Sequence, residues 1–347
     1  MHDPKRILKN PSVLFYLLIL AAIAVGFGLK GVQERKAAMD QQNAKNDKAA
    51  SQNWNPLSPE EKRVILQKGT ERAFTGKYWN HIQKGWYACR QCGALLYESN
   101  DKFKSDCGWP SFDEELSDAV KRRPDADGFR TEIVCANCGG HLGHVFLGEH
   151  LTPKDTRHCV NSISLEFIPR EKLQTAIFAG GCFWGVAHQF NKQPGVRFAG
   201  VGYIGGVVDN PTYKQVCSGL TGHREAVQIL FDPKKTSYET LAKRFFEVHD
   251  PTQDDGQGPD IGIQYQSAVF YTSDEQKKTI QKLLKELRDL GYDPVTELIP
   301  AKGHTFWPAE KYHQNYYEKT GKEPYCHVYT PRFKKEEKKE VEEKPAP

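Results

Sequence analysis

One stretch decides the fold of the second half of this chain: TAIFAGGCFWG at residues 175–185. Its first five residues are apolar or β-branched and predict a buried strand, and the glycine pair lets the chain turn sharply into a helix. A thiol at such a helix start lies where backbone N–H groups point outward, and the positive end of the helix dipole lowers a thiol pKa. The stretch therefore predicts a strand–turn–helix unit that presents Cys182 as a reactive thiol.

The residues that follow alternate between strand and helix patterns. A capping box from Thr236 to Glu239 predicts a helix that runs to about Val248. Ser273 caps another helix, whose apolar stripe at residues 280, 283, 284, 287 and 290 ends at Gly291. We expect residues 173–331 to form one α/β or α+β domain.

The first half of the chain has a different pattern. Ser58 opens a capping box with Pro at the first helical position, and the short helix is followed by β patterns at residues 86–89, 131–134 and 162–167. Residues 54–169 are therefore predicted to form a β-rich domain, joined to the second domain at residues 169–172. This division agrees with a length of 347 residues, since about 150 residues per domain is usual.

Two C-x-x-C pairs lie in the first domain, Cys89 with Cys92 and Cys135 with Cys138, and each is followed by glycine. Four thiolates in a tetrahedral array are typical of a closed, structural zinc site, so we expect Zn²⁺ to staple this domain. The alternatives are two disulfides, free core thiols, or a zinc ribbon that binds nucleic acid. The net charge of only +4, with no basic stripe, argues against nucleic acid as a partner.

The amino-terminal segment predicts a membrane anchor. Residues 13–29 carry no charge, and Lys5, Arg6 and Lys9 precede them, so we expect residues 1–12 to stay cytoplasmic and the rest to cross the membrane. A cleaved signal ending at Ala22-Ile23-Ala24 is the alternative, which would give a soluble secreted or periplasmic protein. Residues 30–53 are predicted to be a tether and residues 332–347 a charged, disordered tail.

A third feature is a thiol near two imidazoles. Cys159 is flanked by Arg157 and His158, whose positive charge favours a thiolate, and His141 and His144 are proton donors suited to neutral pH. From the pattern alone, catalytic and structural roles both stay open for these residues.

These residues carry a resemblance to methionine sulfoxide reductase B, the family that acts on the R epimer. The matching segments are 69–71, 102–103, 107–112, 130–132, 141–146 and 159–162, together with the four paired cysteines. The resemblance implies that Cys159 is the nucleophile, Cys107 the resolving thiol, and Trp109 the residue that packs the substrate methyl. It assigns polarisation of the sulfoxide oxygen to His141, His144 and Asn161, and a supporting contact to Arg157. Residues 147–150 and His158 depart from the family pattern.

The second domain resembles methionine sulfoxide reductase A, the family that acts on the S epimer and has an α+β sandwich fold. The matching segments are 180–185, 210–213, 221–227, 264–268 and 309–314, with Asp260 and Cys326. The resemblance implies that Cys182 attacks sulfur, Phe183 and Trp184 hold the methyl, and a protonated Glu225 donates to the oxygen. It further implies that Tyr213 and Tyr265 bind that oxygen, that Asp260 orders the site, and that Cys326 resolves Cys182 as a disulfide. Cys217 is expected to be a packed thiol.

The two resemblances imply a methionine sulfoxide reductase B–A fusion that repairs oxidised proteins or reduces free methionine sulfoxide, and the apolar run at residues 13–29 adds the expectation of a membrane anchor. Nine cysteines fit four for zinc, two for each site and one spare. Each turnover leaves a disulfide, so a thioredoxin-like dithiol must reduce the enzyme, through a membrane electron carrier if the domains are extracytoplasmic (periplasmic in a bacterium). A general thiol–disulfide oxidoreductase and a zinc-dependent interaction module are the alternative functions.

Overall fold

The computed structural model describes residues 54–333. The predicted cytoplasmic flank, membrane anchor and tether lie outside this range, as does nearly all of the predicted tail. Within residues 54–333, the structure contains no helix that is both long and apolar enough to span a bilayer.

The first domain begins with a short helix, α2 (Pro59–Ile65), and the predicted capping box is present. The Ser58 side chain accepts a hydrogen bond from the Glu61 N–H, and the Glu61 carboxylate accepts one from the Ser58 N–H. Val64 and Ile65, at the end of the helix, are buried. The cap thus fixes the start of a helix whose last turn faces the interior.

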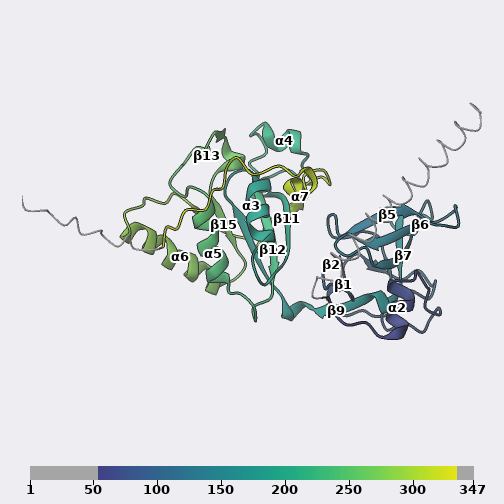
Figure 1. Ribbon diagram of the computed structural model, residues 1–347. Helices are drawn as coiled ribbons and strands as arrows, with labels where there is room; N and C mark the ends of the chain where they lie inside the picture. Colours follow the sequence, from purple (N-terminus) through teal and green to yellow (C-terminus); the bar gives the residue numbers. More distant parts are fainter. Residues whose placement is uncertain (1–53, 334–347) are drawn as a thin grey trace, which may run out of the picture. The chain divides into compact units, whose positions relative to one another are not determined.

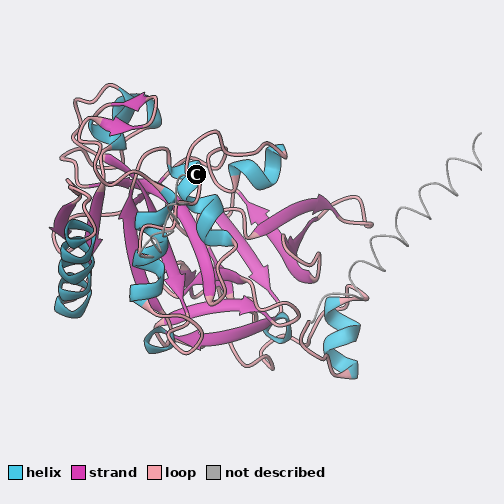
Figure 2. Ribbon diagram, turned by 60° about the vertical axis from the view of Figure 1, so that its left-hand side comes forward, coloured by secondary structure: helices cyan, strands magenta, loops and turns pink. Residues whose placement is uncertain are grey.

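Two antiparallel sheets build the rest of this domain, and Figure 2 shows its strands in magenta. The three-stranded sheet has the order β2-β1-β9, with β1 (Gly85–Cys89), β2 (Leu95–Glu98) and β9 (Leu165–Pro169). The six-stranded sheet has the order β3-β4-β8-β7-β6-β5, with β3 (Lys102–Phe103), β4 (Ser111–Phe112), β5 (Val120–Pro124), β6 (Thr131–Cys135), β7 (His141–Leu147) and β8 (Thr156–Val160). Aromatic rings fill the core, where Tyr97 stacks on Phe112 at 4.2 Å.

The prediction of a strand over residues 162–167 was partly wrong. Residues Ser162–Ser164 form a 3₁₀ turn, and the strand begins only at Leu165. The cause lies in Glu71, whose carboxylate accepts hydrogen bonds from the N–H groups of Ser162 and Ile163. These two N–H groups are therefore not available to pair with a neighbouring strand. Alternation in the sequence does not reveal such a long-range contact.

The second domain is built on a six-stranded sheet of order β16-β15-β10-β12-β11-β17, of which Figure 1 labels β11, β12 and β15. All its neighbours pair antiparallel except β15 with β16, so the domain is α+β rather than a parallel α/β fold. Its strands are β10 (Gln174–Ala179), β11 (Val196–Ile204), β12 (Arg224–Phe231), β15 (Ala268–Tyr271), β16 (Glu297–Pro300) and β17 (Trp307–Pro308). A small hairpin of β13 (Gly256–Gln257) and β14 (Asp260–Ile261) precedes β15.

Helices α3 (Phe183–Asn191), α5 (Tyr238–Val248) and α6 (Asp274–Asp289) pack on this sheet, and α4 (Tyr213–Cys217) and α7 (Tyr316–Thr320) are short. Residues of β10 alternate between the two faces of the sheet, as in any strand. Phe178 therefore stacks on Phe245 of α5, while Ile177 joins a cluster on the opposite face. Ser273 caps α6 as predicted. The cap of α5 is Ser237 rather than Thr236, since the Ser237 hydroxyl accepts from the Thr240 N–H.

Candidate active sites

The four paired cysteines of the first domain form one cluster. Their Sγ atoms all lie within 4.8 Å of one another, and the Cys89–Cys138 and Cys92–Cys135 pairs are 3.6 Å apart. Two equivalent turns present them, since Gly93 and Gly139 have φ near +73° and donate their N–H groups to the carbonyls of Cys89 and Cys135. The glycines predicted to shape the knuckles therefore do so by adopting a left-handed conformation.

This cluster fits a tetrahedral zinc ion. With Zn–S bonds of 2.3 Å, sulfurs at the corners of a tetrahedron are about 3.8 Å apart, close to the separations found here. Four sulfur ligands leave no open coordination position, so such an ion would be structural. It would join the turn after β1 to the turn after β6 and would take no part in a reaction.

Cys107 and Cys159 form a thiol pair in the same domain, with their Sγ atoms 3.7 Å apart. The hydrogen bond from Cys159 lowers the pKa of Cys107 to about 4, while the same bond raises the pKa of Cys159. Since the proton can reside on either sulfur, the lowered pKa belongs to the pair. Burial also raises the pKa of Cys159, and the nearby Arg157 opposes this rise without reversing it, so the structure does not bear out the predicted thiolate at Cys159 itself.

Cys159, but not Cys107, lines a cavity of about 110 Å³. Trp109 and Asn161 also line it, so three residues predicted to serve one reaction lie around one space. The indole N–H of Trp109 donates to the Glu71 carbonyl at 3.1 Å, which fixes the ring. The Asn161 side chain is held by the main chain, accepting from the Glu71 N–H and donating to the Leu142 carbonyl.

The two histidines differ in position. His144 lines the cavity and is hydrogen-bonded through Nε2 to Asp125. His141 is buried, its Nδ1 lies 2.8 Å from Glu132, and its Nε2 has no hydrogen-bond partner among the described residues. Burial lowers the pKa of His141, which keeps it neutral. Neither carboxylate was predicted as a partner of these histidines, because the pairing of β6 with β7 that brings up Glu132 and the turn after β5 that holds Asp125 are properties of the fold.

Arg157 and His158, the two residues before Cys159, have different partners and different effects on its thiol. Arg157 makes a two-bond pair with Glu149, at 2.7 and 2.8 Å, and its guanidinium lies 4.4 Å from the Phe146 ring. Glu149 belongs to the segment that departs from the reductase B pattern, so this loop supplies the counter-ion of Arg157. The prediction that His158 supports the thiolate was wrong, because alternation along β8 buries it on the other face and burial lowers its pKa to about 4.

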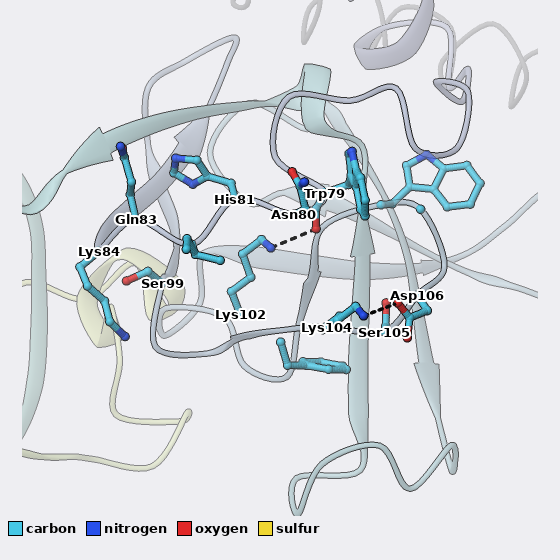
Figure 3. A pocket seen from close by; sticks show the side chains of 14 residues that line it. Trp79, Asn80, His81, Gln83, Lys84, Ser99, Lys102, Lys104, Ser105 and Asp106 are labelled. Atoms are coloured by element: carbon cyan, nitrogen blue, oxygen red, sulfur yellow. Dashed lines mark hydrogen bonds and ion pairs between the residues drawn. The ribbon is translucent and has the colours of Figure 1, made fainter.

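A second cavity, of about 270 Å³, shares Trp109 with the first (Figure 3). Three lysines line it, and Figure 3 shows Lys102 hydrogen-bonded to the Trp79 carbonyl and Lys104 paired with Asp106. Asp106 is the only acidic residue among its lining residues, so the cavity combines aromatic walls with excess positive charge. This second cavity lies beside the cavity that Cys159 lines, and it was not predicted from the sequence.

In the second domain, Cys182 lies directly before α3, as predicted, and is 7% exposed. The expectation of a lowered pKa was wrong. Burial and the nearby Glu225 raise the pKa of Cys182, and they outweigh the backbone N–H groups of Trp184 and Gly185, which lower it. The helix dipole acts only over the first turn, and desolvation of a buried thiolate exceeds it here.

Glu225 projects from β12 beside the same helix start. Its carboxylate accepts a hydrogen bond from the Phe183 N–H at 3.1 Å, and the side chain is 2% exposed. Burial raises the pKa of Glu225 to about 8. The carboxyl is therefore mostly protonated at neutral pH and has a proton to give.

Aromatic side chains surround Cys182 and Glu225. Trp184 stacks on Tyr316 at 3.8 Å and donates its indole N–H to His313. Phe183 is buried in the domain core, 1% exposed, so it supports the site from beneath. Tyr213 and Tyr265 are half-buried, and burial raises the pKa of both hydroxyls, which remain donors at neutral pH. Tyr316 and His313 were not predicted, because their roles arise from stacking between distant segments.

Cys326 lies on the carboxyl-terminal segment of the same domain, half-buried, and burial raises its pKa to about 12. The preceding Tyr325 donates its hydroxyl to Asp260 at 2.7 Å. That Asp260 orders the site stays a prediction. Cys217 is exposed, so the prediction of a packed thiol was wrong. It ends the short helix α4, whose buried residue is Val216.

These two cysteine-centred sites, on a β-rich domain and an α+β domain, define a two-domain thiol-dependent oxidoreductase. Residues 57–169 match the SelR domain, and residues 174–345 match the family described as peptide methionine sulfoxide reductase. The chain belongs to the peptide methionine sulfoxide reductase A family, with the SelR domain preceding that region, and it is a peptide methionine sulfoxide reductase.

Among its relatives, the peptide methionine sulfoxide reductase MsrA of Nautilia profundicola is 48% identical over 161 residues, which is 46% of this chain and 92% of the relative. The enzyme of the same name from Thermus thermophilus is 47% identical, over 48% of this chain and 94% of its own length. Of the solved structures, methionine sulfoxide reductase A of Corynebacterium diphtheriae is 32% identical, with a TM-score of 0.41, over 45% of this chain and 79% of that structure.

Proposed function

We propose that the first domain reduces the R epimer of methionine sulfoxide and the second domain the S epimer, each through a cysteine sulfenic acid and an intramolecular disulfide. The observation that carries this proposal is the presence of two separate thiol sites, each with its own proton donors and its own second cysteine. In the first, Cys159 lines the cavity, and the Sγ atom of Cys107 lies 3.7 Å from the Sγ atom of Cys159. In the second, Cys182 lies at the start of α3 beside the protonated Glu225.

The chemistry in the second domain balances without an external proton. Glu225 gives its proton to the sulfoxide oxygen and Cys182 attacks the sulfur, so that the oxygen is transferred to the cysteine sulfur and methionine leaves. The thiol proton of Cys182 then replaces the one that Glu225 donated. Cys182 is oxidised to sulfenic acid, and the sulfoxide is reduced by two electrons. Cys326 attacks the sulfenic acid and releases water, which leaves the Cys182–Cys326 disulfide.

The first domain follows the same sequence with different groups. Cys159 attacks, His144 and Asn161 polarise the oxygen, and Trp109 packs the methyl. Cys107 then closes the disulfide with Cys159. The positive charge of Arg157 would assist formation of the thiolate at Cys159. A zinc ion held by Cys89, Cys92, Cys135 and Cys138 would join the turns after β1 and β6. The lysine-rich cavity beside Trp109 offers room for a residue next to the oxidised methionine, which supports oxidised proteins as substrates.

Both disulfides must be reduced after each turnover, and we propose a thioredoxin-like dithiol as the electron donor.

We further propose that residues 13–29 anchor the chain in a membrane. The two domains are then extracytoplasmic and receive electrons from a membrane electron carrier. Protease protection of the full-length protein in spheroplasts tests this topology. Digestion of the two domains from outside supports it, and full protection contradicts it.

The central test is an epimer-resolved assay with dithiothreitol as reductant. Cys159→Ser should abolish reduction of the R epimer and leave the S epimer unaffected, and Cys182→Ser should do the reverse. Cys217→Ser, at an exposed thiol, is the matched control and should retain both activities. Loss of both epimers in either active-site variant would contradict the two-site assignment, and a general thiol–disulfide oxidoreductase would show no epimer dependence at all.

A further inference from the structure

His327, the residue after Cys326, is in contact with that thiol. Its Nδ1 lies 2.7 Å from Cys326 Sγ, and its Nε2 lies 2.8 Å from the Gly180 carbonyl oxygen. A carbonyl oxygen only accepts hydrogen bonds, so Nε2 must carry the ring proton. Nδ1 therefore presents a lone pair to the sulfur, and the S–H of Cys326 is the donor in this contact.

Two glycines of the segment 180–185 make the space for this ring. A Cβ on Gly185 would lie 2.4 Å from Nδ1 of His327, and one on Gly181 would lie 3.3 Å from Nε2. Gln189, one turn after Gly185 on α3, donates its side-chain amide to the His327 carbonyl at 3.0 Å. The helix that carries Cys182 thus also fixes the orientation of the imidazole.

The backbone at His327 is strained, since its φ is +66° and it is not a glycine. Such a conformation persists only where the surroundings hold it, and it turns the Cys326 and His327 side chains toward each other. The residue is 5% exposed. A strained and buried imidazole that contacts a half-buried thiol indicates a chemical role rather than a packing role alone.

The electrostatic surroundings leave His327 neutral. Burial lowers the pKa of His327, while the Gly180 carbonyl and Asp260 raise it. The imidazole of His249, on the other side of Gly180, is also buried and neutral, and it is hydrogen-bonded to Ser267. A neutral imidazole is able to accept a proton. Cys326 needs such an acceptor, because with a pKa of about 12 only about one molecule in 10⁵ is a thiolate at pH 7.

We propose that His327 is the general base that deprotonates Cys326 when it attacks the sulfenic acid of Cys182; this rests on the function proposed above. Nδ1 takes the thiol proton, the Cys326 sulfur forms a bond to the Cys182 sulfur, and the S–O bond of the sulfenic acid breaks. The departing hydroxide takes up the proton and leaves as water. Cys326 is oxidised as the sulfenic acid is reduced, so the step needs no outside oxidant.

Single-turnover kinetics on the full-length, pre-reduced protein separate this step from the one before it. The protein is mixed with S-methionine sulfoxide without reductant, and quenched samples are assayed for methionine and for the Cys182–Cys326 disulfide. His327→Gln should form one equivalent of methionine at the wild-type rate, because its amide replaces the Nε2 donor to Gly180. Its disulfide should form at least 100-fold more slowly, with dimedone-reactive sulfenic acid accumulating in the interval.

His304→Gln is the matched control and should match the wild type in both steps, since His304 packs against Phe270 and contacts neither thiol. A wild-type disulfide rate in His327→Gln overturns the proposal. The pH profile of the wild type decides the matter even if that variant fails to fold. With His327 as base, the rate constant for conversion of the sulfenic acid to the disulfide, fitted separately from the methionine-forming step that needs protonated Glu225, is flat from pH 7 to 9, whereas a tenfold rise of that constant per pH unit overturns the proposal. A wild-type protein that forms no methionine would instead refute the proposed function.

Discussion

Replacing Glu225 with glutamine should make the protein more stable and nearly inactive toward the S epimer. The folded state keeps Glu225 protonated, with its pKa raised by burial from 4.5 to about 8, whereas the unfolded chain releases that proton above pH 4.5. The stability that depends on this group is therefore complete below pH 4.5 and is lost as the pH rises to 8. Glutamine does not titrate, yet its carbonyl oxygen still accepts the hydrogen bond from Phe183.

The magnitude follows from the same pKa. At about 1.4 kcal/mol per pH unit, keeping the carboxyl protonated costs the folded state about 3 kcal/mol at pH 7, about 4 kcal/mol at pH 8 and about 1 kcal/mol at pH 5. Glu225→Gln should recover these amounts, because Glu225 is 2% exposed and solvent screens it little. Loss of the proton donor should lower kcat for the S epimer by about 10²–10⁴-fold.

Urea unfolding of the full-length protein at pH 5, 7 and 8 measures the stability difference, and the S-epimer assay measures activity in the same samples. Glu323→Gln, at an exposed carboxyl of the same domain, is the control and should change neither quantity. The reasoning fails if the stability difference between Glu225→Gln and the wild type is the same at pH 5 and pH 8, or if the variant is the less stable protein at pH 7.

Three further predictions concern the first domain. Cys135→Ser should reduce bound zinc, measured by atomic absorption, from one per chain to near zero, and it should remove R-epimer activity. Cys217→Ser is the control and should keep the metal. An unchanged zinc content in Cys135→Ser would refute zinc binding by the four-cysteine cluster. Glu149→Gln should lower kcat/KM for the R epimer about fivefold, because the lost pairing with Arg157 is about 1 kcal/mol for a partly exposed carboxylate; S-epimer kinetics are the internal control. Gly143→Ala should destabilise the domain by about 1–3 kcal/mol in urea unfolding, since a Cβ there would lie 2.0 Å from a main-chain carbonyl of β8; unchanged unfolding would contradict the close approach.

Local patterns were sufficient for several elements. The capping box at Ser58 formed as predicted, because it is complete within four residues. Ser273 also caps its helix, but the reciprocal half of the box is absent, since the Gln276 side chain accepts from the Thr272 N–H. The strand before Cys182 and the helix after it also formed as predicted. The cap at Thr236 was misplaced by one residue, since Ser237 offers an equivalent hydroxyl and local sequence does not decide between them.

Charge states at the two sites were less predictable than residue positions. The dipole argument for Cys182 and the flanking-charge argument for His158 both gave the wrong direction, and burial is the first cause in each case. Desolvation depends on how many atoms from distant segments cover a group. Glu149 and His327 were likewise missed as partners of Arg157 and Cys326, although each lies within a few residues of a recognised motif.

Residue type and spacing were sufficient for the two C-x-x-C pairs and for the strand–turn–helix that presents Cys182, because each of these features is built within a few residues. The roles of attacking and resolving cysteines rest on the family resemblance and stay predictions. Packing of distant segments sets which groups are charged and which face one another, such as the neutral His327 beside Cys326 and the protonated Glu225 beside Cys182. Burial and long-range contact set those properties, and both arise only when distant segments pack together.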